Sequence, residues 1–245
     1  MTESSSQTQT KPSIGIAIST YNRVEKLDRC INSVLASTFK NTEIFVYCDN
    51  RDISSYEYIK RQYPGILVTL NQTAKYVVKN WNDYFKYCSK EHDASLWLVA
   101  DAELFRDTLE KAYNCLIQNY SDLDGAVGLH QICPGFPQYQ YKPSGLSMLG
   151  RKFIERYKEA DYQVCCPDYI HFSNGEFYKY VTSINKFTLC EEAKVFHYHP
   201  SYNKAWADET HFAVRDEIIK ADKHTAIARE HLIWGREFTL INNGT

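Results

Sequence analysis

The sequence predicts an α/β protein built on a mainly parallel sheet with helices on both faces. Short β-branched apolar runs alternate with amphipathic stretches of helical period along residues 13–130, which is typical of this architecture. The run SLWLVA, residues 95–100, is apolar on both faces, as a central parallel strand requires. A length of 245 residues with 44% hydrophobic residues suffices for one such domain. In this class, ligands bind beyond the carboxyl ends of the strands.

The elements follow one another in a regular order. Strands are expected at residues 13–19, 42–50, 65–71, 95–100, 124–130 and 187–200. Helices are expected at residues 24–37, 54–63, 73–90, 106–120, 147–160 and 175–186. The first helix repeats apolar side chains at Leu27, Ile31 and Val34, and Pro64 ends the second. The charged, amphipathic segment 207–245 predicts one or two surface helices that complete the fold.

Charge, cysteine content and the length of apolar runs exclude several classes of protein. The chain has 28 basic and 30 acidic residues, so no overall field attracts nucleic acid or anionic lipid. Its eight cysteines form no CxxC pair and are expected to be reduced and structural. No apolar run reaches the ~18 residues of a membrane span, and the opening lacks a signal-peptide pattern, so a cytoplasmic protein is expected. The polar segment 1–12 is expected to be a disordered tail, and residues 139–143 in a Tyr- and Pro-rich loop are expected to form a mobile lid.

Two carboxylates follow the apolar run 95–100. Asp101 falls at the carboxyl end of the expected strand, and Glu103, two residues on, would point to the same side in an extended chain. Carboxylates directed at one point repel each other unless a cation lies between them, and their oxygens suit Mg²⁺ or Mn²⁺. In the alternative interpretation, Asp101 caps the next helix and Glu103 is solvated.

The order of several short motifs resembles a known family. IAISTYNR, a strand ending at Asp49, VKN in the third helix and LWLVADAE together resemble the nucleotide-sugar half of the family 2 glycosyltransferases, over residues 13–130. The resemblance implies a Rossmann-like GT-A fold, with 131–206 as the acceptor-binding and catalytic half of the same domain and 207–245 as C-terminal helices. The acidic motif here is D-A-E where D-x-D is commoner, and the longer Glu side chain could bind a metal through water.

The resemblance assigns roles in the first half of the chain. The donor nucleotide would contact Thr20, Tyr21, Arg23, Asp49, Lys79 and Asn80. Asp101 and Glu103 would hold Mn²⁺ or Mg²⁺ on the diphosphate, where the cation neutralises charge on the leaving group. The competing interpretations are a plain turn at TYNR, helix-cap support by Asp49 and an ordinary exposed lysine at position 79.

The second half supplies the remaining candidates. PSGLSMLGRKFIE resembles the stretch near the donor sugar, and Asp168 in VCCPDYIHF lies where inverting members place the general base. Asp168 could instead be the N-cap of the next helix, which would leave Glu176 as the base. His197 and His199, two apart on a strand, face one side and could complete the metal site; alternatively, they are an exposed or core histidine pair.

These assignments predict a metal-dependent, inverting glycosyltransferase that uses a nucleotide-diphosphate sugar. The acceptor would be a glycan, a small molecule, a protein or a modified nucleobase. A sugar nucleotidyltransferase shares the sheet and the acidic pair, but the loop STYNR lacks the glycines expected for holding a triphosphate. A non-catalytic carbohydrate- or nucleic-acid-binding module on the same fold is the alternative from another class.

Overall fold

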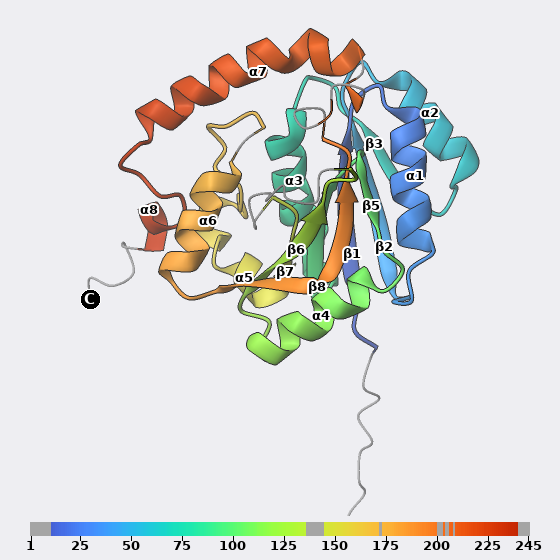
Figure 1. Cartoon of the computed structure of the whole chain (residues 1–245). Coiled ribbons are helices and arrows are strands. Elements are labelled where there is room, and N and C mark those ends of the chain that lie inside the picture. The colour runs from blue at the N-terminus through green and yellow to red at the C-terminus, as the bar shows by residue number, and fades with distance from the viewer. Residues whose placement is uncertain are drawn as a thin grey trace, which may run out of the picture.

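The computed structural model describes residues 11–135, 145–171, 173–199, 203, 206–207 and 209–239. Most of the expected tail and the whole of the expected lid at 139–143 lie outside the described residues. Within the described part, the strands form one eight-stranded sheet in the order β3-β2-β1-β4-β7-β6-β8-β5 (Figure 1).

The first half is a set of parallel strands joined by helices, as the alternating pattern predicts. Its strands are β1 (Ile14–Thr20), β2 (Thr42–Cys48), β3 (Leu67–Leu70) and β4 (Ala94–Val99). Its helices are α1 (Val24–Leu35), α2 (Ile53–Gln62) and α3 (Tyr76–Tyr87), followed by a short 3-10 turn, η1 (Ser89–Glu91). β1 pairs in parallel with both β2 and β4, so the strand order reverses at β1. Such a reversal opens a crevice beyond the carboxyl ends of these strands.

The second half adds antiparallel strands. Its elements are β5 (Ala102–Leu104), α4 (Thr108–Asn119), β6 (Ala126–Ile132), β7 (Ser147–Gly150), α5 (Arg151–Glu155), η2 (Lys158–Ala160), α6 (Asn174–Ser183) and β8 (Phe187–His197). β6 and β8 are parallel, whereas β7 is antiparallel to β4 and β6, and β5 is antiparallel to β8. The sheet is therefore mainly parallel, as expected.

The helix predicted over residues 147–160 is wrong in its first four residues. Residues 147–160 were expected to form a single helix, but Ser147–Gly150 is the strand β7, and the helix begins only at Arg151. All four residues of β7 are buried between β4 and β6, which supply its hydrogen-bond partners. A Cβ at Gly150 would lie 2.1 Å from the Leu123 carbonyl oxygen, so this close approach requires glycine. Pairing with two neighbours overrides the local helical pattern.

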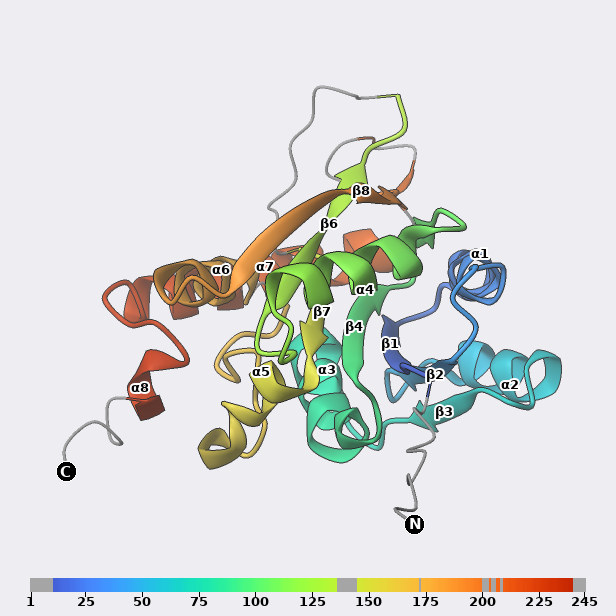
Figure 2. The same cartoon turned by 90° about the horizontal axis from the view of Figure 1, so that it is seen from below.

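Helices cover both faces of the sheet around one aromatic core. α3 and α4 lie on opposite sides of β4 (Figure 2). Trp97 of β4 stacks on Trp81 of α3 with ring centroids 5.1 Å apart, and it contacts Phe177 of α6 edge-on at 5.0 Å. All eight cysteines are free. The core therefore joins helices of both halves to the central strand.

Two C-terminal helices complete the described chain: α7 (Glu209–Ala228) and α8 (Arg236–Thr239). α7 crosses the end of the sheet at which β1 finishes, and α8 lies beside α6 (Figure 1). None of the helices in the described ranges combines the length and the apolar character needed to cross a bilayer.

Candidate active site

The centre of the site is the carboxylate of Asp101, directly after β4. Asp101 is 5% exposed. Its Oδ2 atom lies 3.3 Å from Nη1 of Arg23, on the loop after β1, and its Oδ1 atom lies 3.6 Å from Nε2 of His197, at the end of β8. The backbone N–H of Tyr198 donates to the Asp101 carbonyl at 2.9 Å, which holds the end of β8 against the end of β4. Sheet pairing thus brings Asp101 close to His197, which lies 96 positions further along the chain (197 − 101).

The protonation of Asp101 follows from these neighbours. Burial alone would raise the pKa of the carboxyl group, but the interaction with His197 and the charges of Arg23 and His199 outweigh it and lower the pKa below its usual range. Asp101 is therefore an anion held by cationic or polar groups. Because β5 follows it, the interpretation of Asp101 as a helix cap is wrong.

His197 is oriented by a second contact. Its Nδ1 atom lies 2.8 Å from Oε1 of Gln131 on β6. An amide oxygen only accepts, so Nδ1 donates this bond, and Nε2 is the ring nitrogen that faces Asp101. A distance of 3.6 Å from Nε2 to Oδ1 is too long for a hydrogen bond. It is shorter than twice the metal–ligand distance of about 2.1 Å, so these two atoms fit a shared divalent cation.

The other two expected ligands are placed differently. Glu103 on β5 pairs with Nε of Arg29 at 3.2 Å and accepts a hydrogen bond from the Tyr198 hydroxyl at 3.5 Å. The ring of His199 lies 5.3 Å, centroid to centroid, from that of His197. Across the described ranges, no group of three or more His, Cys, Asp or Glu side chains is arranged to hold a metal ion. The structure therefore brings Asp101 and His197 together and holds Glu103 by separate partners.

One end of the crevice is formed by the loops after β1 and β2. Asn22 turns the loop TYNR with φ 50°, a left-handed conformation that Asn tolerates. The guanidinium of Arg51 lies 5.1 Å from the centre of the Tyr21 ring, and its Nε atom is 3.9 Å from Asp49 Oδ1. Together these residues form a polar and aromatic surface of the kind that a nucleobase contacts.

Asp49 and Thr20 carry buried oxygens at this end. Asp49 Oδ1 and Thr20 Oγ1 have no hydrogen-bond partner among the described residues. Burial raises the pKa of Asp49, although the backbone N–H groups of Arg51 and Asn50 and the Arg51 charge oppose the rise. The N-cap of α2 is Asp52, which accepts from Ser55 N, so Asp49 itself is not the cap.

The VKN motif divides into an exposed residue and a buried one. Lys79 is exposed on α3. Asn80 is 1% exposed; its amide donates to Ser19 Oγ at 2.8 Å, and its Oδ1 accepts from Asn71 Nδ2 at 2.8 Å. Its side chain thus ties the end of β1 to the residue after β3. Asn80 therefore lies at the edge of the crevice, where both of its hydrogen bonds stabilise the fold.

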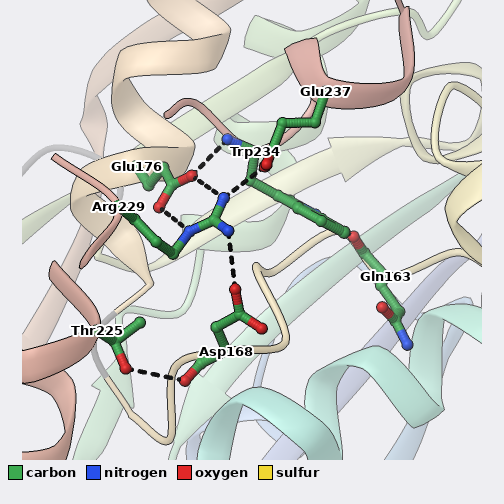
Figure 3. A network of polar contacts seen from close by, with 7 residues as sticks. All are labelled: Gln163, Asp168, Glu176, Thr225, Arg229, Trp234 and Glu237. Atoms are coloured by element: carbon green, nitrogen blue, oxygen red, sulfur yellow. Dashed lines mark hydrogen bonds and ion pairs between the residues drawn. The ribbon is translucent and has the colours of Figure 1, made fainter. Parts of the chain in front are cut away.

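Asp168 lies in the loop between η2 and α6. Its side chain is 57% exposed, and Oδ2 accepts from Arg229 Nη1 at 2.8 Å (Figure 3). The N-cap of α6 is Ser173, so Asp168 does not cap that helix. Glu176, the alternative base, is buried and takes two hydrogen bonds from Arg229, at 3.1 and 2.6 Å. Asp168 is the more accessible carboxylate.

His171, which the sequence did not single out, is influenced by the charges of the Asp101 centre. Burial lowers its pKa to about 4, and among the charges that act on it are those of Asp222, Arg23, Asp101 and His197. The side chain therefore lies in the electrostatic field of the Asp101 centre. The stretch VCCPDYIHF offers no periodicity from which this position could be read.

Comparison with known proteins identifies the fold. The model of "Glycosyl transferase family 2" matches residues 15–181. Among solved structures, S. aureus TarS matches with a TM-score of 0.59 and 15% identity, over 77% of this chain and 37% of that one. The TarS 1–349 complexes with UDP and with UDP-GlcNAc both match with a TM-score of 0.61 and 12% identity. They cover 79% and 76% of this chain and 63% and 58% of theirs.

This chain thus spans less than two thirds of the length of these solved proteins. No curated protein matches it in sequence. The family model nevertheless covers more than half of the chain and includes the loop after β1, Asp49, Asp101 and Asp168. The chain therefore belongs to glycosyl transferase family 2, which confirms the expected family and the GT-A fold.

Proposed function

We propose that the protein transfers a sugar from a uridine-diphosphate donor to an acceptor hydroxyl, using a divalent cation and inverting the anomeric centre. The observation that carries this proposal is the pair formed by Asp101 Oδ1 and His197 Nε2, 3.6 Å apart at the carboxyl end of β4. A UDP-sugar is the first donor to consider because the similar S. aureus TarS was solved with UDP and with UDP-GlcNAc.

Asp101 and His197 would hold Mn²⁺ or Mg²⁺, with His199 as a further candidate ligand, whereas Glu103 is held by Arg29 and Tyr198. An imidazole ligand favours Mn²⁺ over Mg²⁺. The cation, when bound, supplies a positive charge for the diphosphate that leaves. Arg23 places a fixed positive charge on the other side of Asp101, at 3.3 Å, and would contribute to the same stabilisation.

The donor nucleotide would lie over the loops after β1 and β2. Tyr21 offers a ring for stacking, and Asp49 Oδ1 and Thr20 Oγ1, which make no hydrogen bond to other described residues, could accept one from a base or a ribose. Arg51, whose guanidinium now lies over the Tyr21 ring, is part of the same surface. Lys79 is exposed and directly precedes Asn80 on α3, so it would contact the nucleotide from the edge of the crevice.

Asp168 would act as the general base. An acceptor hydroxyl is a poor nucleophile unless its proton is removed as the new bond forms. Arg229 fixes one carboxylate oxygen of Asp168, and the exposure of the side chain leaves it accessible to an acceptor. Direct displacement of the diphosphate by the activated hydroxyl inverts the anomeric carbon. The acceptor would be a glycan, a small molecule or a modified nucleobase.

Release of UDP from a panel of UDP-sugars tests this function. The assay is run with Mn²⁺, with Mg²⁺ and with a chelator, each with and without a set of acceptors. We expect UDP release that requires both acceptor and cation. Binding of UDP-sugar without release under every condition would point to a binding module. Release of pyrophosphate from UTP and a sugar phosphate would instead identify a nucleotidyltransferase.

A further inference from the structure

The loop 165–171 carries both Asp168 and His171, and its two ends are held by different helices. At its start, Asn82 of α3 makes two hydrogen bonds to the backbone of Cys165, at 2.8 and 2.9 Å. The following residues are held mainly by α7, which lies outside the segment 15–181 matched by the family model. The position of the two candidate residues therefore depends on a part of the chain that the family pattern does not include.

Asp222 of α7 makes the central contact. It is 4% exposed, and its carboxylate accepts two consecutive backbone N–H groups: Oδ1 accepts from Ile170 at 2.7 Å, and Oδ2 accepts from His171 at 2.9 Å. Hydrogen bonds to an ionised acceptor are about twice as strong as neutral ones. A single buried side chain thus determines where the backbone of His171 lies.

Two more contacts come from the last turn of α7 and from the residue that follows it. Thr225 Oγ1 donates to the Asp168 carbonyl at 3.2 Å, and Arg229 donates to the Asp168 carboxylate at 2.8 Å. Asp222 and Thr225 are three residues apart and project from one side of α7, and Arg229 follows directly after the last residue of the helix, Ala228. We call these three residues the α7 clamp.

The clamp is itself rigidly anchored. Arg229 is bound by Glu176 of α6 and by Glu237 of α8 (Figure 3). Trp234 donates its backbone N–H to Glu176 and its indole N–H to the Gln163 carbonyl, at 2.5 and 2.6 Å. The segment that follows α7 is therefore tied to α6 and to the chain just before the loop.

The same loop also contacts α3. The carbonyl of Ile170 accepts from the backbone N–H of Val78 on α3 at 3.2 Å, so this peptide bridges α3 and α7. His171 follows directly and lies within the field of Arg23, Asp101 and His197. Displacement of this peptide would move His171 away from the Asp101 centre and Asp168 with it.

We infer that Asp222 is a positioning residue for glycosyl transfer: by accepting the N–H groups of Ile170 and His171, it presents Asp168 and His171 together at the Asp101 centre. This inference rests on the proposed function. Asp222 touches no reacting atom and acts through the backbone of the loop.

The test is Asp222→Asn in the full chain. Asn keeps the size of the side chain but has one acceptor oxygen, so one of the two N–H groups loses its partner. Loss of a hydrogen bond to a charged group changes the local opening equilibrium by about 10-fold or more. We therefore expect hydrogen exchange of the amides in 165–171 to quicken by at least about 10-fold. The turnover number should fall by a similar factor, while the donor KM stays within about 2-fold because the donor loops are untouched.

Asp216→Asn, which changes an exposed carboxylate on the same helix, is the matched control and should leave both measurements unchanged. Turnover is divided by the concentration of UDP-binding sites, so that loss of folded protein does not imitate loss of positioning. Should Asp222→Asn not fold, Thr225→Val replaces it, since that variant removes only the hydrogen bond to the Asp168 carbonyl.

The outcomes separate clearly. Unchanged exchange in 165–171 would show that Asp222 does not hold the loop, and faster exchange with unchanged turnover would reduce the clamp to a structural contact. Either result overturns the inference while the proposed function stands. Absence of acceptor-dependent UDP release in the wild-type protein would instead overturn the proposed function, and the positioning role would fall with it.

Discussion

Asp101 is the residue on which the proposed chemistry depends most. Asp101→Asn keeps the size of the side chain and removes the charge that would hold a cation. We expect Mn²⁺-dependent UDP affinity to disappear and transfer to fall by ~10²-fold or more. Calorimetric titration of UDP with and without Mn²⁺ measures the first effect directly.

Glu103→Gln is the matched control for Asp101→Asn. Because Glu103 is held by Arg29 and Tyr198, its loss should change Mn²⁺-dependent affinity by less than ~3-fold. If Glu103→Gln impaired Mn²⁺-dependent affinity more than Asp101→Asn, Glu103 rather than Asp101 would be the cation ligand.

Asp168 is tested at the same scale by substitution with Asn. Asn can still accept the hydrogen bond of Arg229, but it cannot take a proton. Donor affinity should persist while transfer at saturating donor falls by ~10²-fold or more. Asp161→Asn, an exposed carboxylate near the start of the same loop, should retain full activity. Near wild-type transfer by the Asp168 variant would remove it as the base.

Among the elements, the junction between β1, β3 and α3 depends on a single buried amide. Asn80→Ala would leave Ser19 and the side-chain amide of Asn71 without their partner. We expect the free energy of unfolding to fall by ~1–3 kcal/mol, measured by urea denaturation. Lys79→Ala changes the exposed neighbour and should alter it by less than ~0.5 kcal/mol. Weaker UDP binding with undiminished stability would show that Asn80 contacts the nucleotide instead.

At the scale of the whole molecule, two buried histidines link stability to pH. Burial lowers the pKa of His92, although the carboxylate of Glu43, 3.2 Å from its Nε2 atom, opposes this effect. Burial also lowers the pKa of His171, to about 4. In the unfolded chain both would titrate near the ordinary value of about 6.5. As the pH falls, both histidines therefore bind protons in the unfolded state before they do so in the folded state. Their contribution to the free energy of unfolding is complete above about pH 6.5 and is lost as the pH falls toward the folded pKa values.

The expected result is a melting temperature that falls by several degrees between about pH 7.5 and pH 5. Thermal unfolding followed by circular dichroism at a series of pH values measures it. His92→Gln should flatten the profile, whereas His224→Gln, which changes an exposed histidine on α7, should leave it as it is. A profile with the same slope in His92→Gln and wild-type protein would exclude His92 as a source of the dependence.

The sequence by itself determined the parallel half of the fold and the place of the site. The apolar runs that become β1, β2 and β4 are buried on both faces, so their pattern is unambiguous, and the residues that end them, Asp49 and Asp101, must lie at one edge. Local pattern also indicated α6 and β8, and hence the strand on which His197 lies. These features depend on short stretches of chain.

Tertiary structure alone decided which side chains meet. The residues of β7 were predicted to be helical because the strands that bury them, β4 and β6, are separate elements that the local pattern does not reveal. Asp101 and Glu103, two apart, have different partners because the chain turns between β4 and β5, whereas Asp101 and His197 meet through the pairing of β5 with β8. The contact of Asp222 with His171 joins α7 to a loop without periodic pattern. Such contacts depend on the packing of separate elements, which no local pattern specifies.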